Sequence, residues 1–449
     1  EGIGMPLPPA RTIMYVRRHL SADALYASLR SAFCKVPDHR ANGSRITMAD
    51  ALMSALAMFA LKDPSLLAFD ERRHDQNLQN LMGIAKVPCD TQMREILDPA
   101  DPEELRPAFG TIFREAQRGK VLKKLQFYQG CYLLLMDGTG YFSSQHIHCD
   151  SCLTKVSSTT GEVTYQHQQL GVVLAHPDHK EVLPLAPEAI VQQDGSNKND
   201  CERNASKRLL RKIRREHPRL KLIVVEDGLA SNGPHVRELM DLGMHFLLGA
   251  KPGDHAFLYE QVTAAWKEDR LTRFSWKQDG VRCEVFFVNG VPLNAENQDL
   301  IVNFLHYVEY DADGEIQSVF SWITDLKIRR NNAQLLVRGG RARWKIENET
   351  FNTLKNQGYH YEHNYGHGHQ HLSVVFAMLM MLAFLVDQVQ QLSCPLFRAV
   401  WSKVKSKRAL WDNLRSHFRH FRFRSWMHLY EVILYDRGKE VPLSAFDTS

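Results

Sequence analysis

The sequence predicts an α/β protein. We expect a mixed five-stranded sheet with helices on both faces, an antiparallel β-strand insertion before the last core helix, and an all-α N-terminal domain. Three observations predict this class. Residues 20–125 show helical apolar periodicity, and from about Gln126 short apolar runs of strand length alternate with amphipathic stretches. Between residues 257 and 328, apolar and polar residues alternate and are separated by turn signals such as DG and NG.

The composition is that of a globular protein with a large core. Its 449 residues, of which 44% are hydrophobic, suffice for two or three domains. Eight cysteines in so long a chain do not suggest a disulfide framework, so we expect reduced thiols. The longest apolar run, Val374–Val386, is too short to cross a bilayer core of about 30 Å and should form a buried helix. The N-terminal residues lack a charged region followed by an apolar block, which favours a cytoplasmic protein with no membrane partner.

The N-terminal region, residues 1–125, is expected to be a helical DNA-binding domain. Its amphipathic stretches are Asp23–Phe33, Met48–Leu61 and Gln92–Gln117. In PCDTQMREIL, Asp90 or Thr91 should cap a helix that presents Arg94 on an accessible face. We expect Arg94 to contact DNA; the alternative is a dimerisation or packing helix.

The next region, residues 126–256, has the pattern of the first part of a catalytic core. The expected strands are Tyr132–Met136, Tyr165–Ala175, Glu181–Leu185, Leu220–Val225 and His245–Ala250, with helices from about Asp200 and over Pro234–Leu242. Continued through the last core helix, this succession reads βββαβαβα, which is the RNase H-like order. It predicts a mixed sheet with helices on both faces.

Three further regions complete the chain. Residues 257–328 should be the antiparallel insertion, residues 329–392 the last part of the core with a helix over Asn332–Asn356, and residues 393–449 a basic helical region. Two basic stretches, Arg203–Lys221 and Lys403–Arg424, suit a phosphate backbone, although each could equally be a solvated helix face.

Three acidic residues occupy positions at which a metal site is expected. Asp137 ends the apolar run CYLLLMD, Asp227 ends KLIVVED, and Glu347 lies in the helical stretch RARWKIENETFNTLK. Hard divalent cations prefer carboxylate oxygens, and a pair of ions about 4 Å apart stabilises both the attacking and the leaving oxygen at phosphorus. Two strand ends and one helix therefore predict a site for Mg²⁺ or Mn²⁺.

The third carboxylate requires a choice between Glu347 and Glu349. At about 100° per residue, Glu347 shares one helix face with Trp344 and Phe351, whereas Glu349 points roughly 160° away. We expect that face to pack on the sheet, so we assign the role to Glu347 and expect Glu349 to face solvent.

At these residues the sequence resembles the DDE transposases of bacterial insertion sequences, whose RNase H-like catalytic domain carries a β-strand insertion. The resemblance lies in MDGTGYFSS, VVEDGLASNGP and RARWKIENETFNTLK, and it covers roughly residues 130–390. Arg343, Trp344, Ile346 and Glu347 match the family signature directly. Two positions depart from it: Gly340 replaces the expected Tyr, and Leu354 replaces the expected Lys, with Lys355 one residue further on.

The resemblance implies an activity and a set of contacts. Asp137, Asp227 and Glu347 would hold two Mg²⁺ or Mn²⁺ ions for DNA strand cleavage and 3′-OH strand transfer, in a bacterial, nucleoid-associated protein. The implied partners are double-stranded DNA, as transposon ends and target, and a second copy in a homodimer. The implied DNA-contacting residues are Arg341, Arg343 and Lys355, with Trp276 or Trp322 stacking on a flipped base.

A second metal site is suggested by HIHCDSC, which contains His146, His148, Cys149 and Cys152. This CxxC pair could supply half of a structural zinc site, with Cys201 and His167 as candidates for the other half; the alternative is reduced, partly buried thiols. The loop His360–His371 holds five histidines. We expect it to contact phosphate or to cap the next helix, with metal binding as the alternative.

Two other functions remain open from the sequence. One is a structure-specific DNA nuclease on the same fold, which would cut without needing particular ends and without joining strands. The other is a domesticated DNA-binding protein without catalysis, in which a damaged carboxylate set would be expected.

Overall fold

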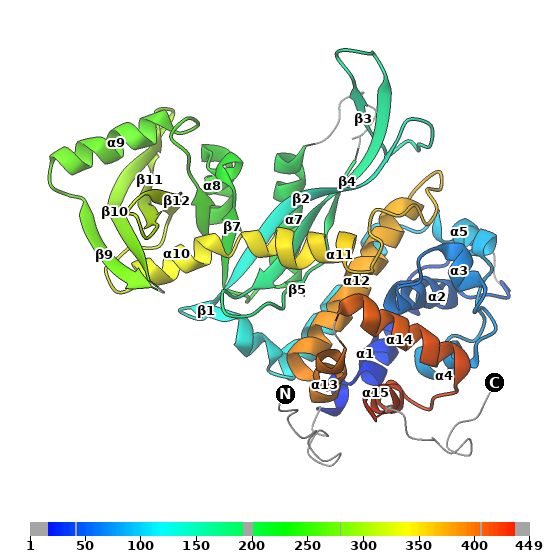
Figure 1. Ribbon diagram of the computed structural model, residues 1–449. Helices are drawn as coiled ribbons and strands as arrows, with labels where there is room; N and C mark the ends of the chain where they lie inside the picture. The colour runs from blue at the N-terminus through cyan, green and yellow to red at the C-terminus, as the bar shows by residue number, and fades with distance from the viewer. Residues whose placement is uncertain (1–16, 41–42, 192–200, 279, 405, 436–449) are drawn as a thin grey trace.

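The computed structural model describes residues 17–40, 43–191, 201–278, 280–404 and 406–435. Within them the protein is α/β, and its strands form one twelve-stranded mixed sheet. Figure 1 shows three parts: the β insertion at the left, the core of the sheet in the centre and a helical part at the right. The expectation that the chain has no signal peptide rests on N-terminal residues that lie outside the described ranges.

The centre of the sheet is built from buried apolar strands. These are β2 (Cys131–Ser144), β4 (Val163–Ala175), β7 (Leu222–Glu226) and β8 (His245–Gly249). Strand β4 is antiparallel to β2, whereas β7 is parallel to β2 and β8 is parallel to β7. The short strands β5 (Leu183–Pro184) and β6 (Glu188–Ile190) pair with the outer side of β4, so this part has the order β5/β6–β4–β2–β7–β8. Strand β1 (Gln126–Tyr128) pairs with β2, and strand β3 (Leu153–Val156) pairs with β4.

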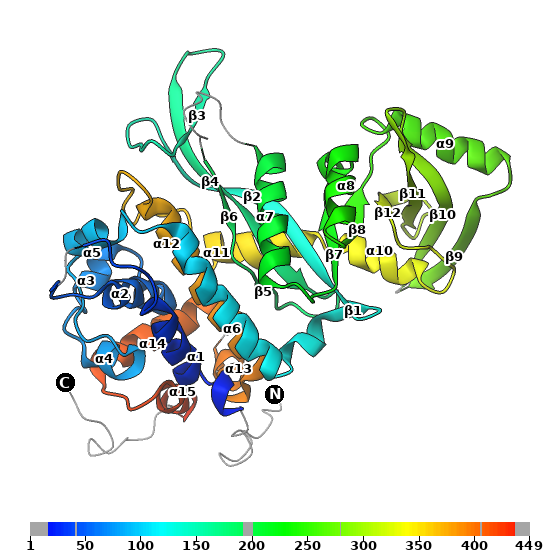
Figure 2. The same cartoon turned by 180° about the vertical axis from the view of Figure 1, so that it is seen from behind.

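Helices cover both faces of this sheet. On the side that faces the viewer in Figure 2 lie α7 (Glu202–Glu216) and α8 (Gly233–Asp241). The opposite face, turned to the viewer in Figure 1, is crossed by α10 (Ala333–Arg341), the π-helix η5 (Ile346–Phe351) and α11 (Asn352–Asn356). The helix expected from about Asp200 therefore begins at Glu202, while Asp200 itself lies outside the described residues.

The expectation of one regular helix over Asn332–Asn356 was wrong. A turn at Ala342 and Arg343 separates α10 from the next helical segment, in which residues Ile346–Phe351 form i→i+5 rather than i→i+4 hydrogen bonds. Because a π-helix has more residues per turn than an α-helix, side-chain directions calculated at 100° per residue do not apply to this segment.

The insertion contains the four expected antiparallel strands. They are β9 (Thr272–Gln278), β10 (Val281–Asn294), β11 (Asn297–Tyr310) and β12 (Ile316–Thr324), and they follow a helix α9 (Ala256–Lys267) that the sequence reasoning missed. Strand β12 also pairs with β8, with Ile323 opposite Leu248. The sheet therefore exceeds the expected five strands, because the insertion continues it instead of standing apart.

The helical part combines the two ends of the chain. Its helices are α1 (Ala22–Phe33), α2 (Met48–Leu61), α3 (Leu66–Asp70), α4 (Gln76–Met82), α5 (Asp90–Leu97), α6 (Arg106–Arg118), α12 (Leu372–Ser393), α13 (Pro395–Lys403), α14 (Lys407–His420) and α15 (Trp426–Tyr435), with short 3₁₀ turns at Arg18–Leu20, Pro102–Leu105 and Val121–Leu125. Figure 1 shows the blue N-terminal and the orange and red C-terminal helices side by side, and α2 packs against α12.

Two helix predictions in this part can be compared directly with the structure. The N-cap of α5 is Cys89, not Asp90 or Thr91, and the stretch Gln92–Gln117 is divided between α5 and α6. Helix α12 contains the apolar run Val374–Val386 and is long and apolar enough to cross a membrane, but 94% of its most apolar window is buried inside the protein. It is a core helix, as expected.

Candidate active site and metal centre

Asp137 lies within β2, not at its end. The strand continues to Ser144, which corrects the expectation that Asp137 is its last residue. Asp137 pairs with Gly171 of β4, and directly opposed residues turn their side chains to the same face of a sheet. A Cβ atom on Gly171 would lie 2.7 Å from the ring of Phe351. The missing side chain of Gly171 therefore lets η5 approach the sheet beside Asp137.

Asp227 lies next to Asp137, directly after the neighbouring strand β7. In the parallel pair β2 and β7, Leu135 is opposite Val225, so each aspartate lies two residues beyond the same paired position. Asp227 directly follows β7 and caps the 3₁₀ turn η4 (Gly228–Ala230), where its Oδ1 accepts a hydrogen bond of 2.9 Å from the Leu229 N–H. The fold thus brings the two predicted aspartates together.

Glu347 and Arg343 complete the arrangement around Asp137. Burial raises the pKa of the Asp137 carboxyl, Arg343 lowers it, and the carboxylates of Asp227 and Glu347 raise it again. Arg343 Nη1 lies 3.1 Å from Asp137 Oδ2. The three acidic groups are therefore close enough to interact electrostatically, and one arginine partly neutralises them.

The structure separates Glu347 from Glu349, although not for the reason given by helical phase. Trp344 is 46% exposed and Glu347 is exposed, so of the three residues expected to share the face that packs on the sheet only Phe351 does so. Glu349 is half-buried. Burial lowers the pKa of Lys345 and of Lys407, and the carboxylate of Glu349 opposes this effect at both lysines. The carboxylate of Glu347 is among the groups that raise the pKa of Asp137.

Two further acidic residues near the aspartates were missed by the sequence reasoning. Glu202 is the first residue of α7, and a Cβ on Gly138 would lie 2.1 Å from its Oε1. Burial raises the pKa of Glu202, and the carboxylates of Asp137, Asp227 and Glu226 raise it further. Buried Glu226 accepts a 2.7 Å hydrogen bond from His235. For Glu226 the available signal was the ED pair in VVED, at the end of a predicted strand run.

A cavity of about 240 Å³ lies on the α7 side of the two aspartates. Its lining includes Asp137, Glu202, Glu226, Asp227 and His235. Glu347 reaches Asp137 from the opposite face, which is the face of η5. The carboxylates thus gather around Asp137 in the middle of β2 and the carboxyl end of β7, from both sides of the sheet.

The other residues expected to contact DNA mostly have partners within the chain. Arg341 pairs with Glu309 at 2.5 Å. Lys355 Nζ lies 2.9 Å from Glu362 Oε1, and Arg94 pairs with Asp90 at 2.6 Å along α5. These basic side chains are exposed or half-buried, so their ion pairs can exchange for contacts with phosphate at little cost.

The two candidate stacking residues differ in accessibility. Trp322 is 5% exposed and packs against Gly340, where a Cβ would lie 2.3 Å from its ring. Because Gly340 has no side chain, it makes room for this buried tryptophan. Trp276 is half-buried between Phe274 and Tyr307, at centroid distances of 5.7 and 5.9 Å. Of the two, only Trp276 retains surface for a further ring.

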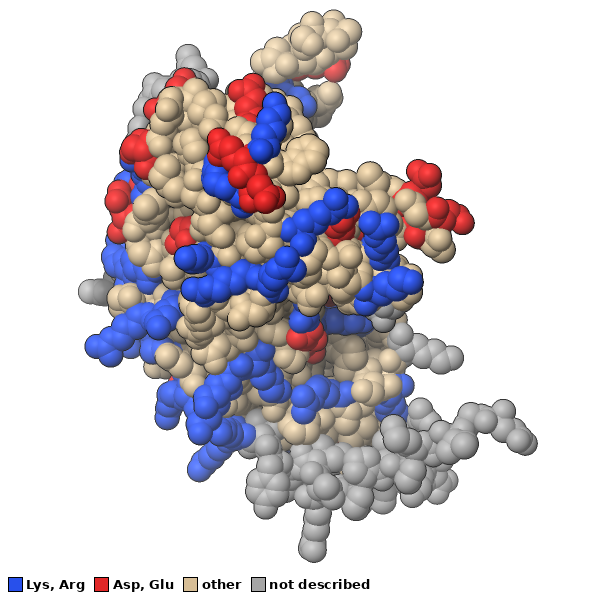
Figure 3. Space-filling view, turned by 90° about the vertical axis from the view of Figure 1, so that its left-hand side faces the viewer, with Lys and Arg blue, Asp and Glu red and all other residues tan. Residues whose placement is uncertain are grey.

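Basic side chains are unevenly placed on the surface. Within the stretch Arg203–Lys221, ion pairs join Arg208 to Glu188, Arg211 to Glu238, and Lys212 to both Glu103 and Glu188. Some of these basic side chains therefore form ion pairs that hold α7 in place. Figure 3, which faces the insertion side, shows Lys and Arg gathered over the middle and lower part of that face. Exposed basic residues of the insertion and its flanks are Lys251, Lys267, Arg270, Arg273, Lys277, Arg282, Lys327, Arg329, Arg330 and Arg341.

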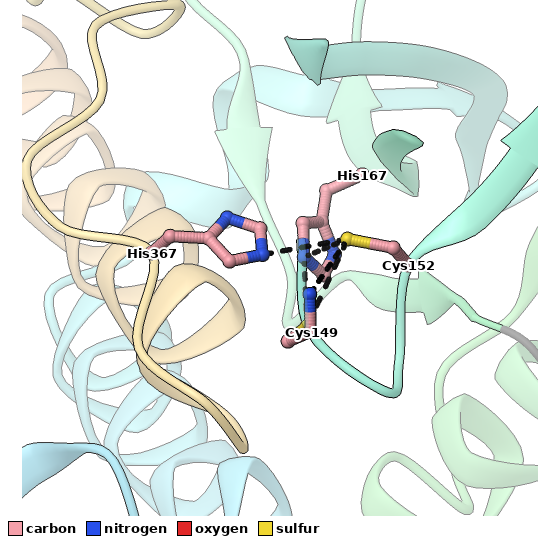
Figure 4. A group of neighbouring side chains, drawn as sticks. All are labelled: Cys149, Cys152, His167 and His367. Atoms are coloured by element: carbon pink, nitrogen blue, oxygen red, sulfur yellow. Dashed lines mark hydrogen bonds between the residues drawn. The ribbon is translucent and has the colours of Figure 1, made fainter. Parts of the chain in front are cut away.

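A separate buried cluster unites Cys149, Cys152, His167 and His367 (Figure 4). Their ligand atoms all lie within 4.8 Å of one another, and the group could hold a metal ion. A hydrogen bond with Cys152 lowers the pKa of the Cys149 thiol. His146, His148 and Cys201 are not members: His148 stacks on Tyr165, and Cys201 is exposed.

Three of these four residues were expected: Cys149 and Cys152 as the CxxC pair, and His167, with Cys201, as a candidate for the other half. His367 was not singled out within the loop His360–His371. The cap of the following helix α12 comes from elsewhere: the Asp98 carboxylate accepts hydrogen bonds from the backbone N–H groups of His369, Gln370 and Leu372. The loop therefore supplies the N-cap residue of α12, His371, but within the described residues no histidine side chain bonds the free N–H groups of the helix.

No protein-family model matches this chain, and no curated protein is significantly similar to it in sequence.

Proposed function

We propose that this protein is a DNA transposase that binds element ends and catalyses metal-dependent DNA strand cleavage and 3′-OH strand transfer, in cut-and-paste transposition. The observation that carries the proposal is the meeting of Asp137, Asp227 and Glu347, with Arg343 beside them. These residues come from two adjacent parallel strands and from a helix that follows the β insertion in the chain. Such an arrangement gathers hard oxygen ligands at one point of a rigid sheet.

The fold supports the same proposal. The order β5/β6–β4–β2–β7–β8, with β4 antiparallel and β7 and β8 parallel to β2, is the order expected for an RNase H-like core. The insertion β9–β12 lies between β8 and the helix that carries Glu347, which is where the resemblance to DDE transposases puts it. Fold alone does not assign chemistry, so the carboxylates carry the functional argument.

The carboxylates fit a divalent cation. Asp137, Asp227 and Glu347 supply oxygen ligands. Burial and, to a smaller extent, the neighbouring carboxylates raise the pKa of Asp137, and a bound cation would oppose both effects. When bound, two Mg²⁺ or Mn²⁺ ions supply charge stabilisation at phosphorus and activate the attacking hydroxyl. Arg343 holds Asp137 in place before DNA arrives and is positioned to take up a DNA phosphate afterwards. The cluster of thiols and imidazoles is a different centre, because Mg²⁺ favours oxygen ligands.

The partner in this proposal is double-stranded DNA. The basic face in Figure 3 would hold phosphates, with Arg341 and Lys355 exchanging their carboxylate partners for the backbone. Two element ends must be joined in one event, so we propose a homodimer on DNA.

The experiment that tests the proposal uses the full chain, DNA carrying the element's flanking terminal repeats, and Mg²⁺. We expect specific nicking at the ends and joined products for the wild type, and a loss of at least about 100-fold for Asp137→Asn and Glu347→Gln. Two control variants make the same change of charge outside the triad and should retain activity. They are Glu349→Gln and Asp299→Asn; Asp299 is exposed on β11 of the insertion and pairs with Arg237. Equal cleavage by wild type and Asp137→Asn would overturn the assignment.

The products distinguish the alternatives. Cleavage of any branched or flapped DNA without joined strands would identify a structure-specific nuclease. Binding of end DNA with no cleavage by the wild type in Mg²⁺ or Mn²⁺ would identify a DNA-binding protein without catalysis.

A further inference from the structure

We propose that Cys149, Cys152, His167 and His367 form a structural zinc site that clamps the loop between α11 and α12 onto the β2–β4 arm of the sheet. The inference does not depend on the proposed function, because it concerns metal content and local stability and uses none of the acidic residues.

The distances fit zinc. Tetrahedral zinc, with bonds of about 2.3 Å to sulfur and about 2.0–2.1 Å to nitrogen, places two sulfurs about 3.8 Å apart and sulfur and nitrogen about 3.5 Å apart. The Cys149 and Cys152 Sγ atoms lie 3.8 Å apart. His167 Nε2 lies 3.4 Å from each sulfur, and His367 Nε2 lies 3.4 Å from Cys152 Sγ. The four groups therefore surround a space of the size that one zinc ion occupies.

The orientations also point to a ligand. Each imidazole turns its Nε2 atom towards the sulfurs, as Figure 4 shows, while its Nδ1 atom is buried without a hydrogen-bond partner among the described residues. The backbone N–H of Cys149 also donates a hydrogen bond of 3.4 Å to Cys152 Sγ. The sulfurs are too far apart for a disulfide, whose S–S bond is about 2.05 Å.

Burial makes the absence of a metal costly. His167 is 1% exposed, Cys152 1%, His367 7% and Cys149 9%. A buried imidazole or thiol without a good partner loses hydration that weak contacts to sulfur do not replace. Four protein ligands would fill a tetrahedral shell and leave no open position, so the site is structural and not catalytic.

The four ligands join segments that are far apart in the sequence. Cys149 and Cys152 lie in the turn between β2 and β3, His167 lies in β4, and His367 lies 215 residues after Cys152. His367 is flanked by Gly366 and Gly368, which have φ angles of +139° and +71°. Glycine tolerates these angles, and a Cβ on Gly368 would also lie 2.2 Å from Asp98. This glycine-flanked turn presents the imidazole to the sheet.

The clamp holds the loop that directly follows the segment carrying Glu347. At its far end the same loop is fixed by Asp98, which caps α12. With zinc bound, the C-terminal half of the segment between residues 357 and 371 is held at two neighbouring places, by the metal at His367 and by Asp98 at residues 369–372. Without it, the contacts between the β2–β4 arm and the loop at this place include the weak hydrogen bond between Cys152 Sγ and His367 Nε2 and the packing of Phe142 on His367, at a centroid distance of 4.4 Å.

The test is a metal analysis of the full chain. Wild type purified from zinc-containing medium should carry one zinc ion per chain, and the Co²⁺-substituted chain should show the visible absorption of tetrahedral cobalt with thiolate ligands. Cys152→Ser and His367→Asn should lower zinc content at least about tenfold. The matched controls Cys201→Ser and His369→Asn, at exposed positions outside the cluster, should keep it.

A second measurement does not depend on whether the variants fold. Removal of zinc from the wild type by a chelator should make the segment 357–371 accessible to proteases, and added zinc should reverse this. Wild type without zinc, or Cys152→Ser with as much zinc as wild type, would overturn the proposal. Asp137→Asn should keep full zinc content, so a failure of the proposed function and a failure of the zinc site give different results.

Discussion

Arg343 and Asp137, which are 206 residues apart, form an ion pair at 3.1 Å in the centre of the candidate active site. The guanidinium occupies one oxygen of the carboxylate that is proposed to bind metal. Arg343 therefore partly offsets the burial that raises the pKa of Asp137, but a cation that binds there has to compete with Arg343.

Arg343→Gln should separate these two roles. Removal of the guanidinium should tighten Mn²⁺ binding in the absence of DNA by about two- to fivefold, because a partly exposed pair contributes about 0.5–1 kcal/mol. DNA cleavage should fall at the same time, since a phosphate contact is lost. Mn²⁺ titration followed by calorimetry measures the first effect. Arg341→Gln, whose partner is Glu309, is the control, and weaker Mn²⁺ binding by Arg343→Gln would contradict the account.

Gly171→Ala should disturb catalysis through η5. The new methyl group would meet the Phe351 ring at 2.7 Å and push η5, with Glu347, away from Asp137. We expect at least a tenfold loss of cleavage, roughly 1.4 kcal/mol, with a smaller effect on thermal unfolding. Gly171→Ala combined with Phe351→Leu should recover part of the activity. No recovery would mean that Gly171 acts otherwise than by making room for this ring.

Asp387→Asn should strongly destabilise the helical part. Asp387 on α12 pairs with Lys62 at the end of α2, and their side chains are 4% and 1% exposed. Loss of one partner leaves a buried charge and costs about 3–5 kcal/mol. The double variant Lys62→Met/Asp387→Leu removes both charges and should be much closer to wild type. Urea unfolding followed by tryptophan fluorescence measures the difference, because Lys62 Nζ lies 3.9 Å from the Trp411 ring.

The pair His235 and Glu226 predicts a pH-dependent contribution to stability. Burial alone would lower the pKa of His235, but the Glu226 carboxylate, 2.7 Å from Nε2, outweighs burial and raises it. A raised folded-state pKa contributes stability that is complete below the unfolded value of about 6.5 and is lost as the pH rises through the folded value. His235→Gln should therefore cost more stability at pH 6 than at pH 9.

His306 is the control for this measurement because its shift has the opposite sign. Burial lowers its pKa, so the wild-type imidazole opposes folding when it is protonated. His306→Gln should reduce the loss of stability on acidification below about pH 6.5. Thermal unfolding midpoints of both variants across this pH range check the pair. Equal costs of His235→Gln at pH 6 and pH 9 would contradict the first prediction.

Much of the fold could be predicted because its strands and core helices are locally encoded. The runs before Asp137 and Asp227 are buried and continuous, which is typical of central strands, and α12 follows from its apolar length. The π-helix at Ile346–Phe351 could not be predicted, because apolar spacing does not reveal the number of residues per turn. Glu347 was selected by helical phase, but its proximity to Asp137 depends on the turn at Arg343 and on the space at Gly171.

The metal cluster could likewise be predicted only in part, because its residues come from distant parts of the sequence. Cys149 and Cys152 are recognisable from their spacing, but His367 joins them through chain topology that no local pattern contains. The glycines on both sides of His367 were the one available sign that its backbone has a special conformation. Glu202 was missed because it lies outside the strand runs that guided the search and reaches the site from the start of α7.

The pairing of β12 with β8 has a mechanical consequence. A hinge between the insertion and the core would break backbone hydrogen bonds and expose Ile323 and Leu248, both fully buried. The insertion is therefore held in a fixed position relative to the core. Under the proposed function, a duplex that contacts the insertion and the carboxylates at once must bend to the shape of the protein, and the elastic cost of bending depends on base sequence. Some preference among DNA ends would then arise from stiffness alone, at base pairs that no side chain touches.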